Sequence, residues 1–226
     1  RIKKRTPSLC YIEGGFQTLV DRLADVIREH GGIIKTNTSV DSIQQGTKDT
    51  YYVVWGKQKK LFDKIFITIP THIATKLIPQ LLATNYLLLT LSIPHLHAQT
   101  LILETNQPML TKVYWLNILD RTFPFLAVVA HTNFMDKKHY GNRHLTYFGN
   151  YLPDGHPYLS MTKNQLYSKF LPFIKRLTPK SLKFKVLSLH SFVGPFAQPV
   201  HQLHYSTLAP TFETPLKGIY VANLDS

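Results

Sequence analysis

Residues 11–32 have the sequence YIEGGFQTLVDRLADVIREHGG, in which one glycine pair precedes an amphipathic segment and another pair ends it. Apolar side chains recur at three- and four-residue spacing, which predicts a helix with one apolar face. Gly31 offers the left-handed conformation that commonly ends a helix, with Gly32 after it. The predicted apolar face consists of Phe16, Leu19, Val20, Leu23 and Ile27.

Several short β-like runs and one short helical run follow this helix. The last of these β-like runs is almost continuously apolar, which is typical of a strand buried on both faces. It ends at Pro70, after which a short helix is expected. The predicted strands are residues 33–35, 40–45, 50–55 and 61–69, and the predicted helix is residues 71–77.

The second part of the chain is rich in aromatic, β-branched and proline residues, which favours strands separated by turns. A helix is predicted at residues 162–176, where Pro172 should bend the helix or start a new one. The predicted strands are residues 99–104, 112–118, 125–131, 144–151, 184–191 and 218–222.

The 226 residues include 26 Lys and Arg against 13 Asp and Glu, which gives a formal net charge of +13. Such a surface attracts anions. No RNA-recognition signature and no Cys/His finger spacing is present, so we expect no specific nucleic-acid binding. The single cysteine, Cys10, can form neither an internal disulfide nor a cysteine zinc site, which favours a reducing, cytoplasmic compartment.

The longest uncharged run, residues 77–103, contains two prolines and several polar residues. This composition does not suit a membrane helix. We expect a turn or short helix followed by buried strands, and peripheral contact with a membrane stays open. Two histidine pairs, His95 with His97 and His201 with His204, lack matched carboxylates or cysteines, so no metal site is predicted.

Three motifs occur in order along the chain: GGFQTLVDRLADVIREHGG followed by II and VDSI, then LFDKIFITIP, and finally PLKGIYVAN. Their order and spacing resemble the flavin-containing amine oxidase and protoporphyrinogen oxidase-like superfamily of FAD-dependent oxidoreductases. Phytoene desaturases and UDP-galactopyranose mutases are relatives of this superfamily. The later aromatic stretches are most similar to bacterial members. The resemblance implies an α+β (α/β) fold: part of an FAD/NAD(P)-binding domain, and a substrate domain with a mixed β-sheet and flanking helices.

The resemblance divides the chain into three parts. Residues 1–72 would be a partial FAD-binding domain, residues 73–215 a substrate-binding domain, and residues 216–226 a return strand to the FAD-binding domain. The family uses a G-x-G-x-x-G turn to seat the pyrophosphate on a helix N-terminus, yet no G-x-G occurs in the chain. We therefore expect a fragment without the N-terminal dinucleotide-binding motif and the C-terminal flavin-binding segment. Such a fragment would bind FAD weakly or not at all and would be inactive alone.

Four positions are implied to contact FAD in the whole protein. Val40 begins the V-x-x-I motif, and in the family the backbone of this valine hydrogen-bonds the adenine. Ile69 and Pro70 end the strand that approaches the dinucleotide. Asn223 stands where the family often has a glycine–acid pair near the pyrophosphate and the ribityl chain.

No catalytic residue is assigned, because hydride transfer to a flavin needs orientation and electrostatics from the protein but no side-chain triad. The lysine that many amine oxidases place near the flavin is absent from residues 99–104. Gln198, in the segment FAQP, is the expected substrate-facing polar group. Tyr114 and Tyr147 belong to an aromatic set that could line an apolar substrate cavity or form an ordinary sheet core.

Two functions follow from these observations. The first is a fragment of an FAD-dependent oxidoreductase that carries the substrate domain and oxidises a C–N or C–C bond of a small molecule by hydride transfer to flavin. The alternative is a non-catalytic, basic, β-rich module that binds an anionic polymer or lipid. Its binding should weaken steeply as salt rises. The sequence does not indicate an oligomeric state.

Overall fold

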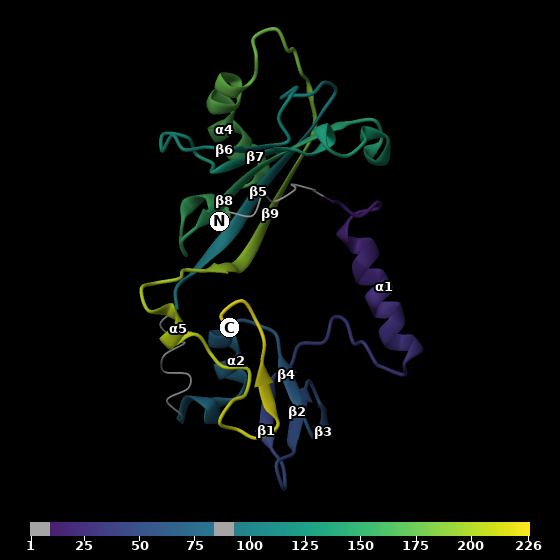
Figure 1. The fold of residues 1–226 in the computed structure, drawn as a ribbon, viewed down its shortest axis with the longest axis vertical. Coiled ribbons are helices and arrows are strands. Elements are labelled where there is room, and N and C mark those ends of the chain that lie inside the picture. Colours follow the sequence, from purple (N-terminus) through teal and green to yellow (C-terminus); the bar gives the residue numbers. More distant parts are fainter. Residues whose placement is uncertain (1–9, 84–92) are drawn as a thin grey trace, which may run out of the picture.

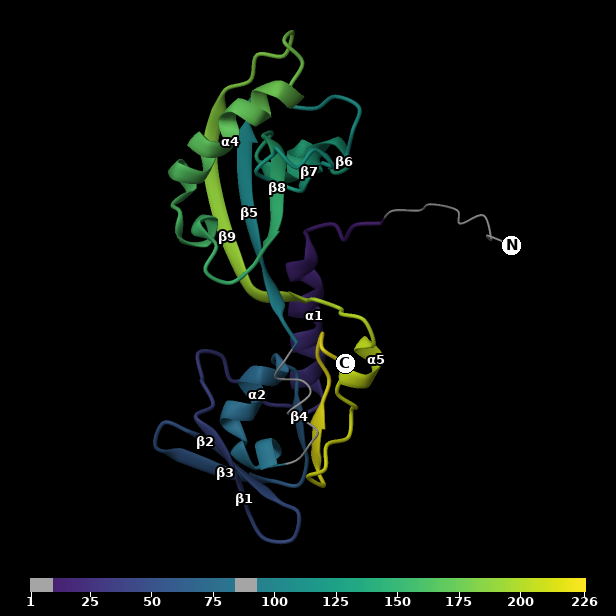
Figure 2. The same cartoon turned by 90° about the vertical axis from the view of Figure 1, so that its left-hand side faces the viewer.

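The computed structural model describes residues 10–83 and 93–226. These residues form two lobes with one helix beside them (Figures 1 and 2). The chain leaves the lower lobe of Figure 1 after helix α2 (Thr71–Leu77), builds the upper lobe, and returns to the lower lobe with strand β10 (Ile219–Val221). Segments from both ends of the sequence therefore make one lobe.

The helix predicted from the glycine-framed stretch is confirmed as α1 (Phe16–Glu29). Gly15 precedes it with φ of 84°, a conformation that suits glycine. At the other end Gly31 adopts φ of 77°. The amide of Gly32 donates to the carbonyl of Ile27 at 2.8 Å, and that of Gly31 donates to Arg28 at 2.9 Å. These two bonds form a Schellman motif, so the second glycine pair ends the helix as predicted.

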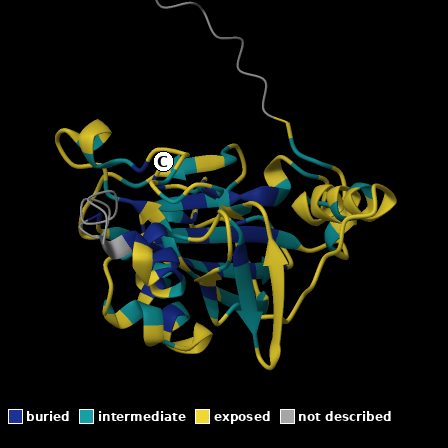
Figure 3. Cartoon of the chain, turned by 90° about the horizontal axis from the view of Figure 1, so that it is seen from below, coloured by how far each residue is buried: buried dark blue, intermediate teal, exposed yellow. Residues whose placement is uncertain are grey.

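The apolar face of α1 is exposed. Phe16 is 62% exposed and Leu23 is 55% exposed. Figure 3 shows the helix at the right, coloured as exposed or intermediate along its length. Tertiary packing therefore contributes little to this helix, and the two capping turns and the ion pairs on its polar face support it.

The lower lobe contains two small sheets. Three strands form an antiparallel sheet in the order β1-β2-β3, and β4 pairs in parallel with β10. Helix α2 packs on them, and its Ala74 lies in a core with Ile43, Tyr51 and Ile67. The strands are β1 (Ser42–Gln45), β2 (Tyr51–Trp55), β3 (Gln58–Phe62) and β4 (Ile65–Ile67).

Two strand predictions in this lobe are wrong. Residues 33–35 form no strand, because their backbone has no hydrogen-bonded partner among the described residues. The run 61–69 is not one strand buried on both faces. It divides between β3 and β4 at Asp63, and Phe66 is 67% exposed. The apolar run reflects residues that line an open groove, described below.

The upper lobe is a five-stranded sheet in the order β6-β7-β8-β5-β9, in which all neighbouring strands are antiparallel. Each strand overlaps a predicted one, and β9 continues further than expected, through the FAQP segment. The strands are β5 (His95–Thr105), β6 (Trp115–Asn117), β7 (Ala127–Ala130), β8 (His144–Leu152) and β9 (Val186–Pro199).

Helix α4 (Lys163–Leu177) covers one face of this sheet. Thr162 and Gln165 form a capping box at its start. The helix continues through Pro172, so this proline does not start a new helix. Beneath it, the rings of Phe125 and Phe170 lie 5.2 Å apart in the core. The remaining helices of the described residues are α5 (Tyr205–Leu208) and the short 3-10 helices η1 (Pro79–Ala83), η2 (His131–Asn133), η3 (Lys137–Tyr140) and η4 (Pro157–Ser160).

The fold class is α+β, as predicted, with the parallel pairing in the lower lobe and the larger antiparallel sheet in the upper lobe. The core of the lower lobe includes Ile78 and Leu81. The domain boundaries given above stay a prediction. None of the helices in residues 10–83 and 93–226 is both long and apolar enough to cross a membrane. Part of the uncharged run 77–103 lies outside the described residues.

Candidate functional site

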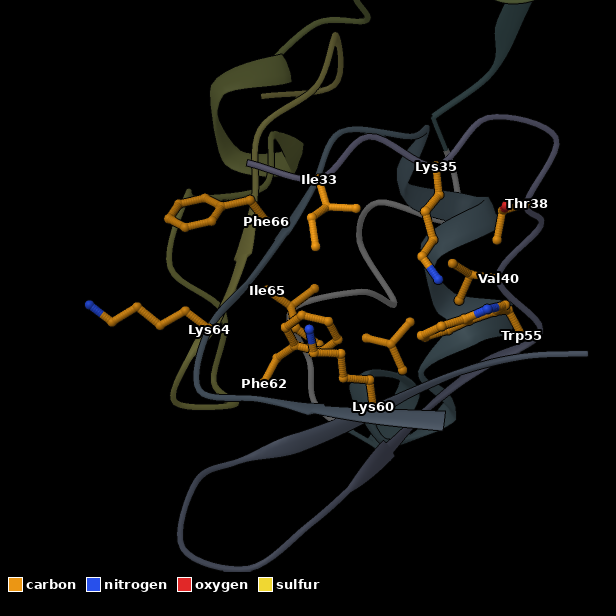
Figure 4. Close-up of a pocket in the computed structure, with 11 residues that line it drawn as sticks. Ile33, Lys35, Thr38, Val40, Trp55, Lys60, Phe62, Lys64, Ile65 and Phe66 are labelled. Atoms are coloured by element: carbon orange, nitrogen blue, oxygen red, sulfur yellow. The ribbon is translucent and has the colours of Figure 1, made fainter. Parts of the chain in front are cut away.

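A groove of about 420 Å³ opens on the lower lobe, between the segment after α1 and strands β2, β3 and β4 (Figure 4). Aromatic rings and lysines line it together. The ammonium group of Lys35 lies 4.6 Å from the centroid of the Trp55 ring, and that of Lys60 lies 5.5 Å from the Phe62 ring. In Figure 4 the Lys35 side chain extends toward Trp55, whereas Lys64 points away. Flat rings beside cations suit an aromatic ligand that carries negative charge.

Val40 lies in the lining of this groove. It is half-buried, and its backbone amide and carbonyl make no hydrogen bond with another described residue. The neighbouring amide of Asp41, in contrast, donates to the carbonyl of Val54 at 2.8 Å. A partly buried backbone donor and acceptor without partners is uncommon in a folded chain. The position therefore fits a ligand that is recognised through the backbone, such as an adenine.

A second arrangement joins the two lobes. The carboxylate of Asp225 is 1% exposed, accepts a hydrogen bond from the amide of Thr71 at 2.9 Å, and contacts His95 Nε2 at 2.6 Å. Burial by itself raises the pKa of Asp225. The hydrogen bonds from Thr71 and His95, with the charge of His95, outweigh that effect and hold the pKa below its ordinary value. Asp225 therefore carries its negative charge inside the protein.

Asn223 and Ile69, both predicted to contact a cofactor, lie side by side. The side-chain amide of Asn223 donates to the carbonyl of Ile69 at 2.7 Å and to the hydroxyl of Thr71 at 3.1 Å. Its oxygen accepts from the amide of Asp225 at 2.9 Å. Pro70 sits at the N-cap of α2 with φ of −50°. Hydrogen bonds thus join the two loops, and the contact of these residues with a cofactor stays a prediction.

An aromatic cluster lies next to this junction. The ring of Phe196 contacts three histidines, with centroids 4.3 Å from His72, 6.0 Å from His95 and 5.1 Å from His97. Phe196 has φ of 52°, unusual for a bulky residue, where the pairing of β5 with β9 shifts register. Burial, and next the charge of His95, lower the pKa of His72. The cluster therefore gathers flat rings next to the buried pair of His95 and Asp225.

A third feature is a cavity of about 370 Å³ on the face of the five-stranded sheet that α4 leaves uncovered. Side chains alternate along a strand, so Phe148 enters the core while Tyr147 and Gly149 face this cavity. Trp115 and Tyr151 also line it. The cavity volume falls in the range of small-molecule sites.

Polar groups gather at one end of this cavity. His131 is 5% exposed, its Nε2 lies 2.6 Å from the hydroxyl of Tyr140, and its ring contacts Tyr11 and Tyr147 at 5.0 and 5.6 Å. Burial lowers the pKa of His131 and raises that of Tyr147, whose pKa is raised further by Tyr11, Tyr140 and Tyr114. Histidine and tyrosine are thus both neutral near pH 7. The hydroxyls of Tyr147 and Tyr11 have no hydrogen-bond partner among the described residues.

The predicted substrate residues separate in the structure. Tyr147 lines the cavity, whereas the ring of Tyr114 packs on Phe134 at 4.9 Å outside the set of lining residues. Gln198 is exposed at the end of β9, and its amide donates to the carbonyl of Pro199 at 3.3 Å. The aromatic set is thus partly cavity wall and partly core. Within residues 10–83 and 93–226, no group of three His, Cys, Asp or Glu side chains is placed to hold a metal ion.

Comparison with protein families gives a match over almost the whole chain. The model of the flavin containing amine oxidoreductases matches residues 1–224. The chain belongs to this family. A comparison with the curated proteins gave no match.

Several solved structures have a fold similar to that of this chain. A candidate protoporphyrinogen oxidase from Exiguobacterium sp. 255-15 matches with a TM-score of 0.76 and 16% identity, over 95% of this chain and 47% of that one. An oxidoreductase from Methanosarcina mazei matches with a TM-score of 0.72 and 17% identity, over 94% of this chain and 50% of that one. A reduced UDP-galactopyranose mutase matches with a TM-score of 0.68 and 10% identity, over 87% of this chain and 42% of that one. At these identities the likeness shows the fold alone. The chain spans about half the length of the structures that it matches.

Sequence reasoning missed many residues of these sites, among them Asp225, His131 and Tyr11. Asp225 follows the PLKGIYVAN motif, but nothing in the sequence pairs it with His95. His131 and Tyr11 stand outside any motif, and only the pairing of β7 with β8 and the path of the segment before α1 bring them to Tyr147. The only sequence signal for the polar end of the cavity was His131, a single histidine directly after the apolar strand β7.

Proposed function

We propose that this chain is the substrate-domain part of an FAD-dependent oxidoreductase, with part of its FAD-binding domain, and that the whole enzyme oxidises a C–N or C–C bond of a small molecule. The observation that carries the proposal is the family match over residues 1–224. The groove around Val40 and the cavity around Tyr147 support it as two separate binding surfaces, one for each reactant.

The groove on the lower lobe fits the adenosine part of FAD. Val40 would offer its unpaired backbone groups to the adenine edge. Trp55 and Phe62 supply flat apolar surface, and Lys35 supplies positive charge for phosphate oxygens. When bound, FAD would supply the acceptor for the hydride, and the protein supplies binding and orientation.

The junction residues position the loop that runs from β4 into α2. Asn223 and Asp225 fix this loop through Ile69 and Thr71, and His95 connects it to the sheet of the upper lobe. A cofactor site at this loop and a substrate site on the sheet would therefore keep a constant separation. Transfer of a hydride requires the two bound reactants to be held in contact and in one orientation, which a fixed junction would favour.

The cavity on the sheet face would hold the substrate. Its walls are aromatic, and the hydroxyls of Tyr147 and Tyr11 are donors without a partner among the described residues. The aromatic walls offer apolar contact area, and the hydroxyls fix the orientation of a polar group. No side chain is required to ionise in this role.

The test is the visible absorption spectrum of the whole gene product, purified without added cofactor. The bands of an oxidised flavin are expected, with bleaching when a reductant is added under nitrogen. A colourless protein that takes up no added FAD would overturn the proposal. Salt-sensitive binding to DNA or acidic vesicles by such a protein would favour the basic binding module instead.

Two variants of the same gene product test the adenosine site. Val40→Ala keeps the backbone amide and should retain the flavin. Val40→Pro removes that amide and should lose flavin on dialysis. Circular dichroism establishes that both variants are folded. Equal retention of flavin by the two variants would show that the Val40 amide takes no part in binding.

A further inference from the structure

The cavity on the sheet face has a floor of small residues. Ala98, Thr100, Ala127 and Gly149 come from three neighbouring strands, and their pairing places Gly149 opposite both Thr100 and Ala127. A Cβ atom added at Gly149 would meet no heavy atom within 4 Å, and its φ lies outside the left-handed region. The glycine is therefore not needed for the backbone. It leaves space above the middle of the sheet.

The walls and the rim differ in chemistry. Trp115 directs its indole N–H to the oxygen of Asn117 at 2.7 Å, so it presents an apolar ring to the cavity. The unpartnered hydroxyls of Tyr147 and Tyr11 are hydrogen-bond donors at the end near His131. The raised pKa of Tyr147 keeps its proton in place. Among the described residues that line the cavity there is no Asp, Glu, Lys or Arg.

We propose that this cavity binds a flat, apolar molecule whose polar end is a carboxylate, and that it rejects a cationic amine of the same shape. The proposal rests on the proposed function in treating the cavity as the substrate site. Donors without a neighbouring acid suit an acceptor group, and the net charge of +13 favours an anion over a cation. Neither ion meets a counter-ion in the lining, but a carboxylate accepts from the hydroxyls of Tyr147 and Tyr11, whereas an ammonium group, which only donates, would have no carboxylate to pair with. Membership of the amine oxidoreductase family does not itself predict this preference.

The experiment compares two probes that share a ring system and differ in charge. Naphthalene-2-carboxylate and 2-(aminomethyl)naphthalene are titrated separately into the whole gene product, with heats measured by calorimetry at pH 7.5. The carboxylate is expected to bind at least tenfold more tightly. Equal binding, tighter binding of the amine, or no binding of the carboxylate would overturn the proposal. Because aromatic rings attract cations, the aromatic walls by themselves would favour the amine, which makes the comparison a stringent test.

Two variants locate the binding. Gly149→Val fills the space above the sheet with a residue that strands tolerate, and it should abolish carboxylate binding. Gln45→Val, an exposed position on β1, is its control. Tyr147→Phe removes one donor and should weaken carboxylate binding by about tenfold. Tyr52→Phe, on β2, is the matched control. Carboxylate binding that survives both cavity variants would place it elsewhere and overturn the proposal.

The two failures are distinguishable. A protein that contains flavin but prefers the amine would refute the carboxylate preference and leave the oxidoreductase proposal intact. A protein that never takes up flavin but binds the carboxylate at Gly149 and Tyr147 would refute the oxidoreductase and leave the ligand class of the cavity intact. Flavin absorption and the heat of probe binding report these outcomes independently.

Discussion

Asp225 lies 2.6 Å from Nε2 of His95, although 130 residues separate them in sequence. The pair connects the C-terminal end of the described chain to the first residue of β5, and so joins the two lobes. Both side chains are almost fully buried, at 1% and 6% exposure. A buried carboxylate persists only where its oxygens are hydrogen-bonded, and the amide of Thr71 supplies a further donor.

Asp225→Ala should destabilise the protein by about 2–4 kcal/mol, because it leaves the buried amide of Thr71 and the ring of His95 without an acceptor. Asp225→Asn keeps one acceptor oxygen and should cost about half as much. Urea unfolding measures both values. The control is Asp154→Asn, whose carboxylate is 95% exposed. A loss for Asp225→Ala no larger than for this control would mean that the junction carries little stability.

Stability should fall as the pH is lowered from about 7.5 to about 5.5. Burial lowers the pKa of His72, His131 and His144 from the ordinary value of 6.5. Below about pH 6.5 the histidines bind protons in the unfolded chain but stay neutral in the folded protein. The free energy of unfolding therefore decreases as the pH falls toward the lower pKa values of the folded state. The lowered pKa of Asp225 acts in a separate window, below about pH 4.

Urea midpoints at several pH values measure this dependence. His131→Gln removes one buried titrating ring and should flatten the slope. His201→Gln, at an exposed position, should leave the slope as in the parent protein. A midpoint that rises or stays constant on acidification would contradict the lowered pKa values of these histidines.

Gly218→Ala should destabilise the lower lobe by more than about 2 kcal/mol. Gly218 has φ of +88°, and an added Cβ would lie 2.8 Å from the carbonyl oxygen of Asp63. Both the left-handed backbone and the contact oppose a side chain, next to the point where β10 pairs with β4. Gly141 also has a left-handed backbone, with φ of +62°, but an added Cβ there would meet no atom within 4 Å. Gly141→Ala should therefore lower the free energy of unfolding by only about 1 kcal/mol, from the backbone conformation alone. Thermal unfolding of the two variants compares them, and an equal loss would mean that the Asp63 carbonyl moves freely.

Local signals in the sequence predicted much of this fold. These signals are the glycine pairs around α1, the proline before α2, and the alternation along β5 and β8. Each depends only on residues close together in the sequence, so residue spacing alone was enough to predict the element. The strand at residues 33–35 failed for the opposite reason. A β-like run becomes a strand only when a partner supplies hydrogen bonds, and no described residue does so. The run 61–69 failed because apolar residues line a groove as readily as they fill a core.

The sequence pointed to a site residue only where the backbone position alone was enough. Val40 was proposed from its motif and lines a groove in the structure, and its contact with a cofactor stays a prediction. The cavity depends on Gly149, Tyr147 and His131 meeting across neighbouring strands, which is set by register. The junction of Asp225 with His95 depends on the return of the chain after the upper lobe. Long-range pairing of this kind leaves no trace in spacing.

Phe170→Ala should cost about 3–5 kcal/mol, because its ring is fully buried on the core-facing side of α4 and packs on Phe125 at 5.2 Å and on Tyr158 at 5.8 Å. Phe66→Ala is the matched change in the lower lobe. Its ring is 67% exposed and stacks on Tyr220 at 4.8 Å, so about 1 kcal/mol is expected. Urea unfolding compares the two variants. A loss at Phe66 as large as that at Phe170 would contradict its exposure, since only a covered ring contributes so much.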